Sequence, residues 1–338
     1  MSHIAIIGAG GWGTALGLVA GRAGHAVRLW SRNAEVVEGI NVRRVNGVYL
    51  AGHSLAGDVR ATGDLGEAVR GARIVILAAP SHATRELLER MASGLHAEVV
   101  IVSATKGIEI ESGQRISEVA GEVLGKECAA RFVCLSGPSF AQEVAAGHPT
   151  AVVAAGYDAR ATLAVQAALS FENFRVYTNG DLVGTELGGA VKNVIALAAG
   201  MVSGLGLGTN SIAALITRGL SEITRLALAE GGRVETLAGL AGMGDLVLTC
   251  TGALSRNRYV GQELGRGRAL AEILSGMHEV AEGVRTTRAV KLLAESREIE
   301  MPITEQVHAV LYEGKSARAA AEDLMARPLR GEFTGMNL

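Results

Sequence analysis

A single lysine lies in the middle of a long apolar stretch of the sequence. The segment GTELGGAVKNVIALAAGMVSGLGLG, residues 184–208, surrounds Lys192 with small and apolar side chains. An ammonium group that is buried without a partner costs free energy, and partial burial favours the neutral amine, which can accept a proton. No residue three or four positions away on a helix carries a charge that could pair with it. Lys192 is therefore a candidate proton-transfer group, and a side chain that extends to water is the alternative.

Hydrogen-bond donors gather in a second segment, LAGMGDLVLTCTGALSRNR, residues 240–258. Besides the carboxylate of Asp245, this segment carries hydroxyl, amide and guanidinium groups at Thr249, Ser255, Arg256, Asn257 and Arg258. Arginine binds phosphate through paired, charge-assisted hydrogen bonds, so this composition favours a small phosphorylated substrate. The alternative is a basic loop that contacts only water.

Two further polar positions each follow an apolar run directly. Lys106 comes after EVVIVSAT, and Gly137 and Ser139 come after RFVCLS, in the turn SGPSF. If both runs are parallel strands, these residues lie beyond the carboxyl ends of the strands, where open α/β sheets bind ligands. Lys106 can then donate to a carbonyl or phosphate oxygen, and the turn can offer backbone N–H groups and a hydroxyl. For each of them, an exposed turn residue is the alternative.

The N-terminal segment IIGAGGWGTALG has the spacing GxGxxG between an expected strand and an expected helix. Gly8 allows a tight turn, Gly10 lets the backbone approach a pyrophosphate, and Gly13 lets the helix pack on the strand. The pyrophosphate would then lie at the N-terminus of the helix. The segment predicts a dinucleotide-binding site.

The residues after the second expected strand, HAVRLW, bear on the choice of dinucleotide. An acidic residue at this point binds the ribose 2′-hydroxyl of NAD, but here Ser31 and Arg32 follow. A guanidinium group suits a 2′-phosphate instead. We therefore expect NADPH to be accepted and preferred, with NADH also accepted. An ordinary solvated Arg32 is the alternative.

The order of apolar runs indicates how these groups are positioned. Short runs of β-forming residues alternate with helical patterns as far as FRVYTNGD, residues 174–181. This alternation predicts a Rossmann-type, doubly wound and mostly parallel sheet. Farther on, apolar residues recur at helical spacing, as at Ile303, Val307 and Leu311. We expect an NAD(P)-binding α/β domain over residues 1–180 and an all-helical substrate-binding and catalytic domain over residues 181–338.

Composition restricts the class of protein and its partners. The 338 residues are 49% hydrophobic, and 32 basic against 34 acidic residues give a net charge of −2, which favours neither nucleic acid nor an anionic membrane. Three cysteines without a CxxC pair indicate reduced thiols, and no metal site is expected. The N-terminus lacks a signal-peptide pattern, and the weakly polar run over residues 194–208 is too short and glycine-rich to span a bilayer. We expect a cytoplasmic protein without stable membrane insertion.

Taken together, these segments resemble the bacterial biosynthetic NAD(P)-dependent sn-glycerol-3-phosphate dehydrogenases. The resemblance covers nearly the whole chain and includes GAGGWGTALG, LSGPSFAQEVAAGHPTAVV, AEGVRTT and the two segments around Lys192 and Asp245, in the order of the family. It implies reversible hydride transfer between the nicotinamide cofactor and C2 of glycerol 3-phosphate or dihydroxyacetone phosphate. It also implies a supply of glycerol 3-phosphate for phospholipid synthesis and a homodimer.

The resemblance assigns roles to individual residues. Lys192 falls on the proton acceptor. The positions that bind substrate are Lys106, Gly137, Ser139, Lys192, Asp245, Ser255, Arg256 and Asn257. The positions that line the nucleotide site are Gly8, Gly10, Gly11, Trp12, Gly13, Arg32, Lys106, Ala141, Arg256, Val280 and Glu282. Gly11 stands where the family often has serine, so one hydroxyl near the phosphates is missing.

Two expectations about the surroundings of Lys192 follow from the assembled residues. Asp245 is the expected partner of its ammonium group. The glycines and alanines of residues 184–208 are expected to give cofactor and substrate room to approach the helix.

Two other functions remain open on sequence grounds. A β-hydroxyacid dehydrogenase or ketopantoate-type reductase shares a Rossmann domain, a helical domain and a catalytic lysine, but its carboxylate substrate does not need the donors of Ser255–Asn257. A regulator that senses NADPH without turnover would not need the two lysines Lys106 and Lys192.

Overall fold

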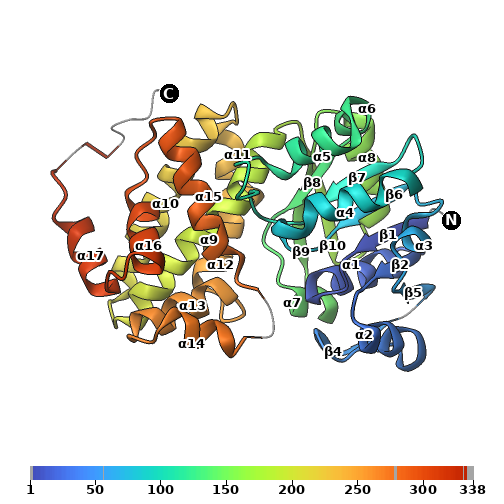
Figure 1. Ribbon diagram of the computed structural model, residues 1–338, viewed down its shortest axis with the longest axis horizontal. Coiled ribbons are helices and arrows are strands. Elements are labelled where there is room, and N and C mark those ends of the chain that lie inside the picture. Colours follow the sequence, from blue (N-terminus) through green and yellow to red (C-terminus); the bar gives the residue numbers. More distant parts are fainter. Residues whose placement is uncertain (1–2, 56, 278–279, 330, 333–338) are drawn as a thin grey trace. The chain divides into compact units, whose positions relative to one another are not determined.

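The computed structural model describes residues 3–55, 57–277, 280–329 and 331–332 (Figure 1). Contacts between residues divide the chain into two compact units. The first consists of Met1–Lys106 and Gln114–Leu182, and the second of Gly107–Gly113 and Val183–Leu338. The first unit contains every strand assigned in the described residues, and the second is helical.

An eight-stranded sheet forms the centre of the first unit. Its spatial order is β10-β9-β8-β7-β6-β1-β2-β5. Neighbouring strands are parallel except β8 and β9, which are antiparallel. The strands are β1 (His3–Ile7), β2 (Ala26–Trp30), β5 (Val59–Thr62), β6 (Ile74–Leu77), β7 (Val100–Ser103), β8 (Val133–Ser136), β9 (Thr150–Ala155) and β10 (Phe174–Asn179). A separate antiparallel pair consists of β3 (Val45–Asn46) and β4 (Leu50–Ser54).

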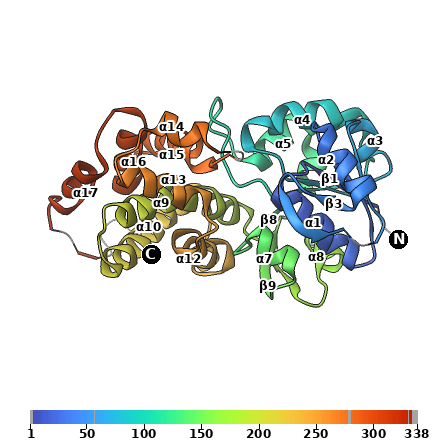
Figure 2. The same ribbon diagram turned by 90° about the horizontal axis from the view of Figure 1, so that it is seen from below.

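Helices cover both faces of this sheet (Figure 2). Successive residues of a strand point to opposite faces, so Ile4 and Ile6 pack into one core and Ala5 and Ile7 into the other. The first core includes α1 (Gly11–Arg22), α7 (Ala141–Ala146) and α8 (Ala159–Leu169). The second includes α3 (Leu65–Val69), α4 (Thr84–Met91) and α5 (Ile116–Leu124). The short helices α2 (Ala34–Glu38) and α6 (Lys126–Ala130) complete the unit.

The strand order identifies the edge of the sheet where a ligand is expected. The chain runs from β1 to β2 on one side and returns to β6 on the other side of β1, so the order reverses between β1 and β6. Open parallel sheets bind ligands at such a reversal, beyond the carboxyl ends of the strands. The predicted doubly wound, mostly parallel sheet and helical second part are therefore confirmed.

The second unit is built around one long helix, α9 (Leu182–Gly204), and every residue from 181 to 201 is buried. A hydrophobic core joins α9 to the helices that follow it. These are α10 (Thr209–Ala229), α11 (Val234–Ala238), α12 (Asp245–Thr251), α13 (Arg256–Gly265), α14 (Leu270–Ser275), α15 (Glu282–Ser296), α16 (Pro302–Tyr312) and α17 (Ala317–Met325).

The glycines of α9 have a different role from the one predicted. A Cβ on Gly200 would lie 2.1 Å from the carbonyl oxygen of Arg258, and one on Gly204 would lie 2.2 Å from that of Gln262. A Cβ on Gly188 would lie 2.8 Å from the carbonyl oxygen of Ala241. The expectation that these three glycines make room for cofactor and substrate is therefore wrong, because the space is filled by the backbone of neighbouring helices.

Helix α9 is also longer than the apolar run that the sequence indicated. Within the described residues it is the one helix long and apolar enough to cross a membrane by length and composition. However, 83% of its most apolar window is buried inside the structure. Its apolar surface is covered by other helices of the second unit, as in the core of a globular domain.

Candidate active site

The glycine loop of the first unit has the geometry that its sequence predicts. Gly8 follows β1 with a φ of +114°, and a Cβ there would lie 2.9 Å from the backbone of Ala78 and Ala79. A Cβ on Gly13 would lie 1.9 Å from the carbonyl oxygen of Gly8. Side chains at these two positions are therefore excluded by the backbone itself.

The same loop leaves space for a bound group at its outer side. A Cβ on Gly10 would meet no atom within 4 Å, and Gly10 is the residue before α1, with no side chain to cap the helix. The first N–H groups of α1 therefore remain suited to an anion. The indole Nε1 of Trp12 is buried without a hydrogen-bond partner in the described structure. Gly11 begins α1 beside it. These features fit the pyrophosphate of a dinucleotide.

One residue that supports this loop has no recognisable signal in the sequence. Asn46, in β3, is fully buried, and its Nδ2 donates to the carbonyl oxygen of Ala9 and to Thr14 Oγ1, both at 2.8 Å. It ties the glycine loop to the start of α1 from 32 or more residues away. Only the folded chain brings these residues together.

Arg32 lies beside an open depression of about 500 Å³ at the end of β2. The depression is lined by Ser31, Arg32, Ala34, Val37, Glu38 and Gly63. The Arg32 side chain is exposed, and the Glu38 carboxylate is paired with Arg43 at 3.1 Å. Because Arg43 partly neutralises Glu38, a guanidinium group at position 32 can still favour an anionic ligand here.

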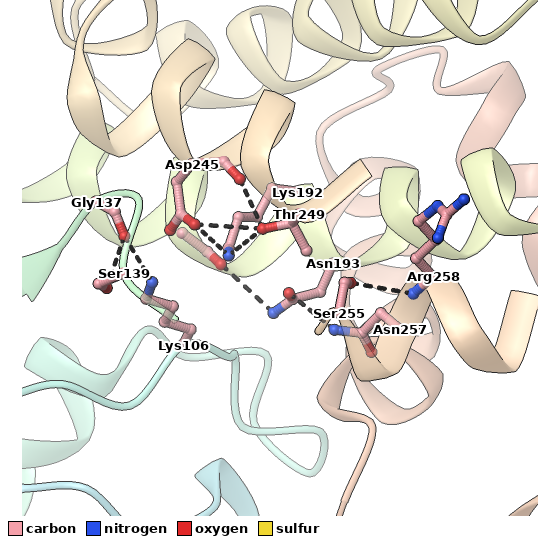
Figure 3. A network of polar contacts seen from close by, with 11 residues as sticks. Lys106, Gly137, Ser139, Lys192, Asn193, Asp245, Thr249, Ser255, Asn257 and Arg258 are labelled. Carbon is pink, nitrogen blue, oxygen red and sulfur yellow. Dashed lines mark hydrogen bonds and ion pairs between the residues drawn. The ribbon is translucent and has the colours of Figure 1, made fainter. Parts of the chain in front are cut away.

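Three predicted substrate residues of the first unit share one oxygen atom (Figure 3). The ammonium group of Lys106 donates to the carbonyl oxygen of Gly137 at 3.1 Å, and Ser139 Oγ donates to the same oxygen at 3.0 Å. Gly137 has a φ of +135° directly after β8. Ala141 begins α7, and it packs with Trp12 against the core of this unit.

In the second unit, Lys192 is buried and paired. Its Nζ donates to Asp245 Oδ1 at 2.6 Å and to Thr249 Oγ1 at 2.7 Å (Figure 3). Lys192 is 5% exposed and Asp245 is 1% exposed. The expected pairing with Asp245 is confirmed. The alternative, a lysine that reaches bulk water, is wrong, because the side chain is buried. The ion pair holds the amine in one place inside a site that excludes most water.

Thr249 is the member of this group to which the sequence assigned no specific role. It lies one turn after Asp245 on α12, and its Oγ1 donates to the carbonyl oxygen of Asp245 at 2.6 Å. Because that proton is used on the backbone, the hydroxyl oxygen accepts from Lys192. The i, i+4 spacing of Asp245 and Thr249 on one helix face is the signal that could have identified it.

The residues that are predicted to bind the substrate phosphate lie at the start of α13. Ser255 caps this helix, its Oγ accepting from the N–H of Arg258 at 3.2 Å, and Arg256 and Asn257 are the first two helical residues. Arg256 is exposed and donates to the carbonyl oxygen of Val280 at 3.0 Å. Glu282 begins α15 two residues later. A helix N-terminus with an arginine suits a phosphate.

No cysteine in the site can serve as a nucleophile. Cys250 is 1% exposed, and burial raises the pKa of its thiol to about 12, so it stays neutral. All three cysteines are free, as predicted. Over the described ranges, no three His, Cys, Asp or Glu side chains gather in a way that could hold a metal ion.

Comparisons with known proteins agree on one family. The profile of the NAD-dependent glycerol-3-phosphate dehydrogenase N-terminus matches residues 3–162, and that of the C-terminus matches residues 181–322. Glycerol-3-phosphate dehydrogenase [NAD(P)+] of Koribacter versatilis is 56% identical over 330 residues, covering 97% of this chain and 98% of that protein.

Solved structures extend the comparison. A crystal structure of glycerol-3-phosphate dehydrogenase from Coxiella burnetii is 41% identical, with a TM-score of 0.92 over 96% of this chain and 99% of the other. A ketopantoate reductase from Ralstonia eutropha, 17% identical with a TM-score of 0.57 over 96% of this chain and 99% of the other, shares only the fold. The chain belongs to the NAD(P)-dependent glycerol-3-phosphate dehydrogenase family, and it is therefore an oxidoreductase that uses a nicotinamide dinucleotide.

Proposed function

We propose that Lys192 is the general acid and base of this dehydrogenase. The observation that carries the proposal is the buried Nζ of Lys192, held 2.6 Å from Asp245 Oδ1 and 2.7 Å from Thr249 Oγ1. In ketone reduction the ammonium group gives a proton to the C2 oxygen of dihydroxyacetone phosphate. In the reverse direction the amine takes the proton from the C2 hydroxyl of glycerol 3-phosphate. A bound nicotinamide dinucleotide would supply the hydride to C2 in reduction and accept it from C2 in oxidation.

The neighbouring groups then have distinct tasks. Asp245 and Thr249 fix the amine and, in the case of Asp245, offset its charge. Arg256 and the N-terminus of α13, which Ser255 caps, hold the substrate phosphate, with Asn257 beside them. Lys106, Gly137 and Ser139 bind substrate, and Lys106 also contacts the cofactor. Gly8, Gly10, Gly11, Trp12, Gly13, Arg32, Ala141, Arg256, Val280 and Glu282 line the nucleotide site.

Substitution of the lysine tests the assignment. Proton transfer by a positioned side chain contributes roughly 10²- to 10⁴-fold to rate, so Lys192→Ala should lower kcat with dihydroxyacetone phosphate by about that factor. Binding of NADPH, measured by fluorescence titration, should stay unchanged. Lys126→Ala, which removes an exposed lysine from α6, is the matched control. Near-normal turnover by Lys192→Ala would overturn the proposal.

The preference for NADPH is proposed from Arg32. A charge-assisted hydrogen bond to a 2′-phosphate at an exposed site should lower the KM for NADPH below that for NADH. Arg32→Ala should then raise the KM for NADPH roughly tenfold and leave that for NADH nearly unchanged. Arg60→Ala, at another exposed arginine of the first unit, is the control. A lower KM for NADH in the unsubstituted enzyme contradicts the preference.

The proposal also includes the location, oligomeric state and partners of the enzyme. We expect a cytoplasmic homodimer that supplies glycerol 3-phosphate for phospholipid synthesis and binds neither nucleic acid nor a membrane stably. The near-balanced charge of −2 supports the last two points, because no net field draws in a polyanion. Light scattering in solution should give the mass of two chains, and the mass of one chain would contradict the dimer.

A further inference from the structure

A segment of the first unit that lies outside the main sheet reaches the glycine loop through one side chain. This segment, residues 39–55, follows α2 and contains the antiparallel pair β3 and β4. We call it the hairpin segment. Its Asn46 is fully buried and donates from Nδ2 to the carbonyl oxygen of Ala9 and to Thr14 Oγ1, both at 2.8 Å. A distant part of the chain thus holds the backbone of the loop directly.

The orientation of the Asn46 amide is fixed by its hydrogen bonds. The backbone N–H of Tyr49 can only donate, and it does so to Asn46 Oδ1 at 3.2 Å. The oxygen of the amide therefore faces Tyr49, and its NH₂ group faces Ala9 and Thr14. A flipped amide would place its oxygen against the carbonyl oxygen of Ala9, with no donor between them. Donor and acceptor chemistry therefore allows one orientation.

The hydrogen bond to Ala9 decides which way the next N–H group points. The peptide bond between Ala9 and Gly10 is trans and planar, so its C=O and N–H groups point in opposite directions. Because the carbonyl oxygen of Ala9 faces Asn46, the N–H group of Gly10 faces away from Asn46. In the part of the chain that the structure describes, this N–H group makes no hydrogen bond to another backbone group.

The surroundings of Gly10 leave room for a bound group. A Cβ on Gly10 would meet no atom within 4 Å, and the first N–H groups of α1 follow Gly10 directly. These groups suit an anion because their hydrogens point along the helix axis and out of its N-terminus. The N–H of Gly10 adds one donor to this set as long as Asn46 keeps the Ala9 carbonyl oxygen turned toward itself.

The hairpin segment is itself fixed to the edge of the main sheet. The side chain of Asn41 exchanges two hydrogen bonds with the backbone of Ala61 in β5, at 2.7 and 2.9 Å. The guanidinium group of Arg44 donates to three carbonyl oxygens within residues 55–59. Asn46 therefore acts from a firmly held element, as a side chain that orients a binding group must.

We propose that Asn46 is a positioning residue for cofactor binding, which orients the Ala9–Gly10 peptide so that the Gly10 N–H group donates to the diphosphate of the nicotinamide dinucleotide. The inference rests on the proposed placement of the cofactor at the glycine loop. The role differs from that proposed for Arg32, because NADPH and NADH share the diphosphate. Asn46 sets the affinity for both dinucleotides and leaves the preference between them unchanged.

Direct binding measurements on Asn46 variants test the proposal. Asn46→Ala should raise the Kd for NADPH roughly tenfold, and that for NADH by the same factor, because a charge-assisted hydrogen bond is lost. Asn46→Asp keeps the shape but turns an oxygen toward the Ala9 carbonyl, so it should raise both Kd values at least as much. At saturating dinucleotide, kcat should change by less than about twofold. Fluorescence titration that gives unchanged Kd values would overturn the proposal.

A matched asparagine separates positioning from general loosening. Asn41→Ala also frees the hairpin segment from a neighbour, but it removes no contact with the glycine loop. It should lower the thermal midpoint and leave the Kd for NADPH unchanged. If Asn41→Ala raises this Kd as much as Asn46→Ala does, the cause is a loosened hairpin segment, and the positioning role fails.

A second route does not depend on how the Asn46 variants fold. Gly10→Pro removes the N–H group itself, and the φ of Gly10, −71°, is one that proline adopts. Gly10→Ala keeps the N–H group and adds only a Cβ, so it is the matched control. The Kd for NADPH should be roughly tenfold higher in Gly10→Pro than in Gly10→Ala.

The outcomes also distinguish this inference from the proposed placement of the cofactor. Equal Kd values in the two Gly10 variants, both above that of the unsubstituted enzyme, would reject the role of the N–H group and keep the placement. Normal Kd values in both variants would reject the placement itself, and the inference with it. Lys192→Ala tests the catalytic lysine independently of either result.

Discussion

Buried charged side chains of the second unit are held by specific partners. The ammonium group of Lys192 donates to a carboxylate and a hydroxyl. Glu222 of α10, which is only 3% exposed, contacts the N-terminus of another helix instead. Its carboxylate accepts from the N–H of Ile303 at 2.7 Å and from that of Thr304 at 3.3 Å, so it caps α16 from outside. The contacts of Lys192 place a reactive group, and the contacts of Glu222 with α16 stabilise the fold.

Glu222 should make stability depend on pH. Burial raises the pKa of Glu222 to about 7 from an ordinary value of 4.5, while hydrogen bonds from Ile303 and Thr304 and the charge of Arg225 oppose the rise. The folded state therefore binds the proton more tightly than the unfolded state. The stabilisation of the folded state by proton binding to Glu222 is complete below pH 4.5, and it is lost as the pH rises through about 7.

The comparison with Glu222→Gln measures this contribution. Glutamine resembles the protonated acid, so the variant should have similar stability near pH 5 and become the more stable protein above pH 7. Urea unfolding of both proteins across this range gives the two free energies of unfolding. A difference between them that does not change with pH would show that Glu222 keeps an ordinary pKa.

At the scale of elements, the position of the site depends on the close approach of α9 and α13. Gly200 and Gly204 of α9 face Gly261 and Gly265 of α13, four residues apart on each helix. A Cβ on Gly261 would lie 2.0 Å from the carbonyl oxygen of Leu197, so backbone packs against backbone. This packing places the start of α13, with its predicted phosphate-binding residues, against the lysine-bearing helix.

Gly261→Ala should therefore disturb both stability and substrate binding. The added methyl group must push the helices apart, which typically costs 1–3 kcal/mol, or more where backbone blocks relaxation. We expect a lower thermal midpoint and a raised KM for dihydroxyacetone phosphate. Gly276→Ala is the control, since its Cβ would lie 3.7 Å from the nearest atom, at ordinary contact distance. Equal midpoints for the two variants would contradict the packing argument.

At the scale of the whole molecule, the second unit is not a single continuous piece of chain. The segment Gly107–Gly113, which leaves the first unit after β7, belongs to it. Ile108 is 2% exposed and part of the hydrophobic core of the second unit, and Ile110 packs against that core. The predicted domain boundary near residue 180 divides the rest of the chain as the structure does, but it leaves residues 107–113 in the first domain, whereas they belong to the second unit.

A fragment that starts at residue 181 should consequently be incomplete. Without Ile108 it loses an apolar contact worth roughly 1.5–3 kcal/mol and exposes the surface that Ile108 covers. We expect this fragment to bind a hydrophobic dye and to unfold at lower urea concentration than the helical unit of the full chain. Ile108→Ala in the full chain should lower stability in the same direction. A fragment as stable as the full chain would contradict the assignment of Ile108 to this core.

Local patterns in the sequence were sufficient for much of the fold. Alternating apolar runs predicted the doubly wound sheet, and the helical periodicity predicted the second unit, because period and turn residues are local properties of a chain. The GxGxxG spacing predicted the glycine loop, since its geometry involves residues only a few positions apart. The order of motifs along the chain was enough to suggest the family.

Only the tertiary structure decided which distant residues touch. The partner of Lys192 lies 53 positions away, and Asn193 and Asn257 are separated by 64. The glycines around Lys192 could have faced a ligand or a helix, and the folded chain shows a helix at Gly188, Gly200 and Gly204. Composition and spacing describe what each residue can do, whereas burial and hydrogen-bond direction depend on packing between elements that the chain brings together only on folding.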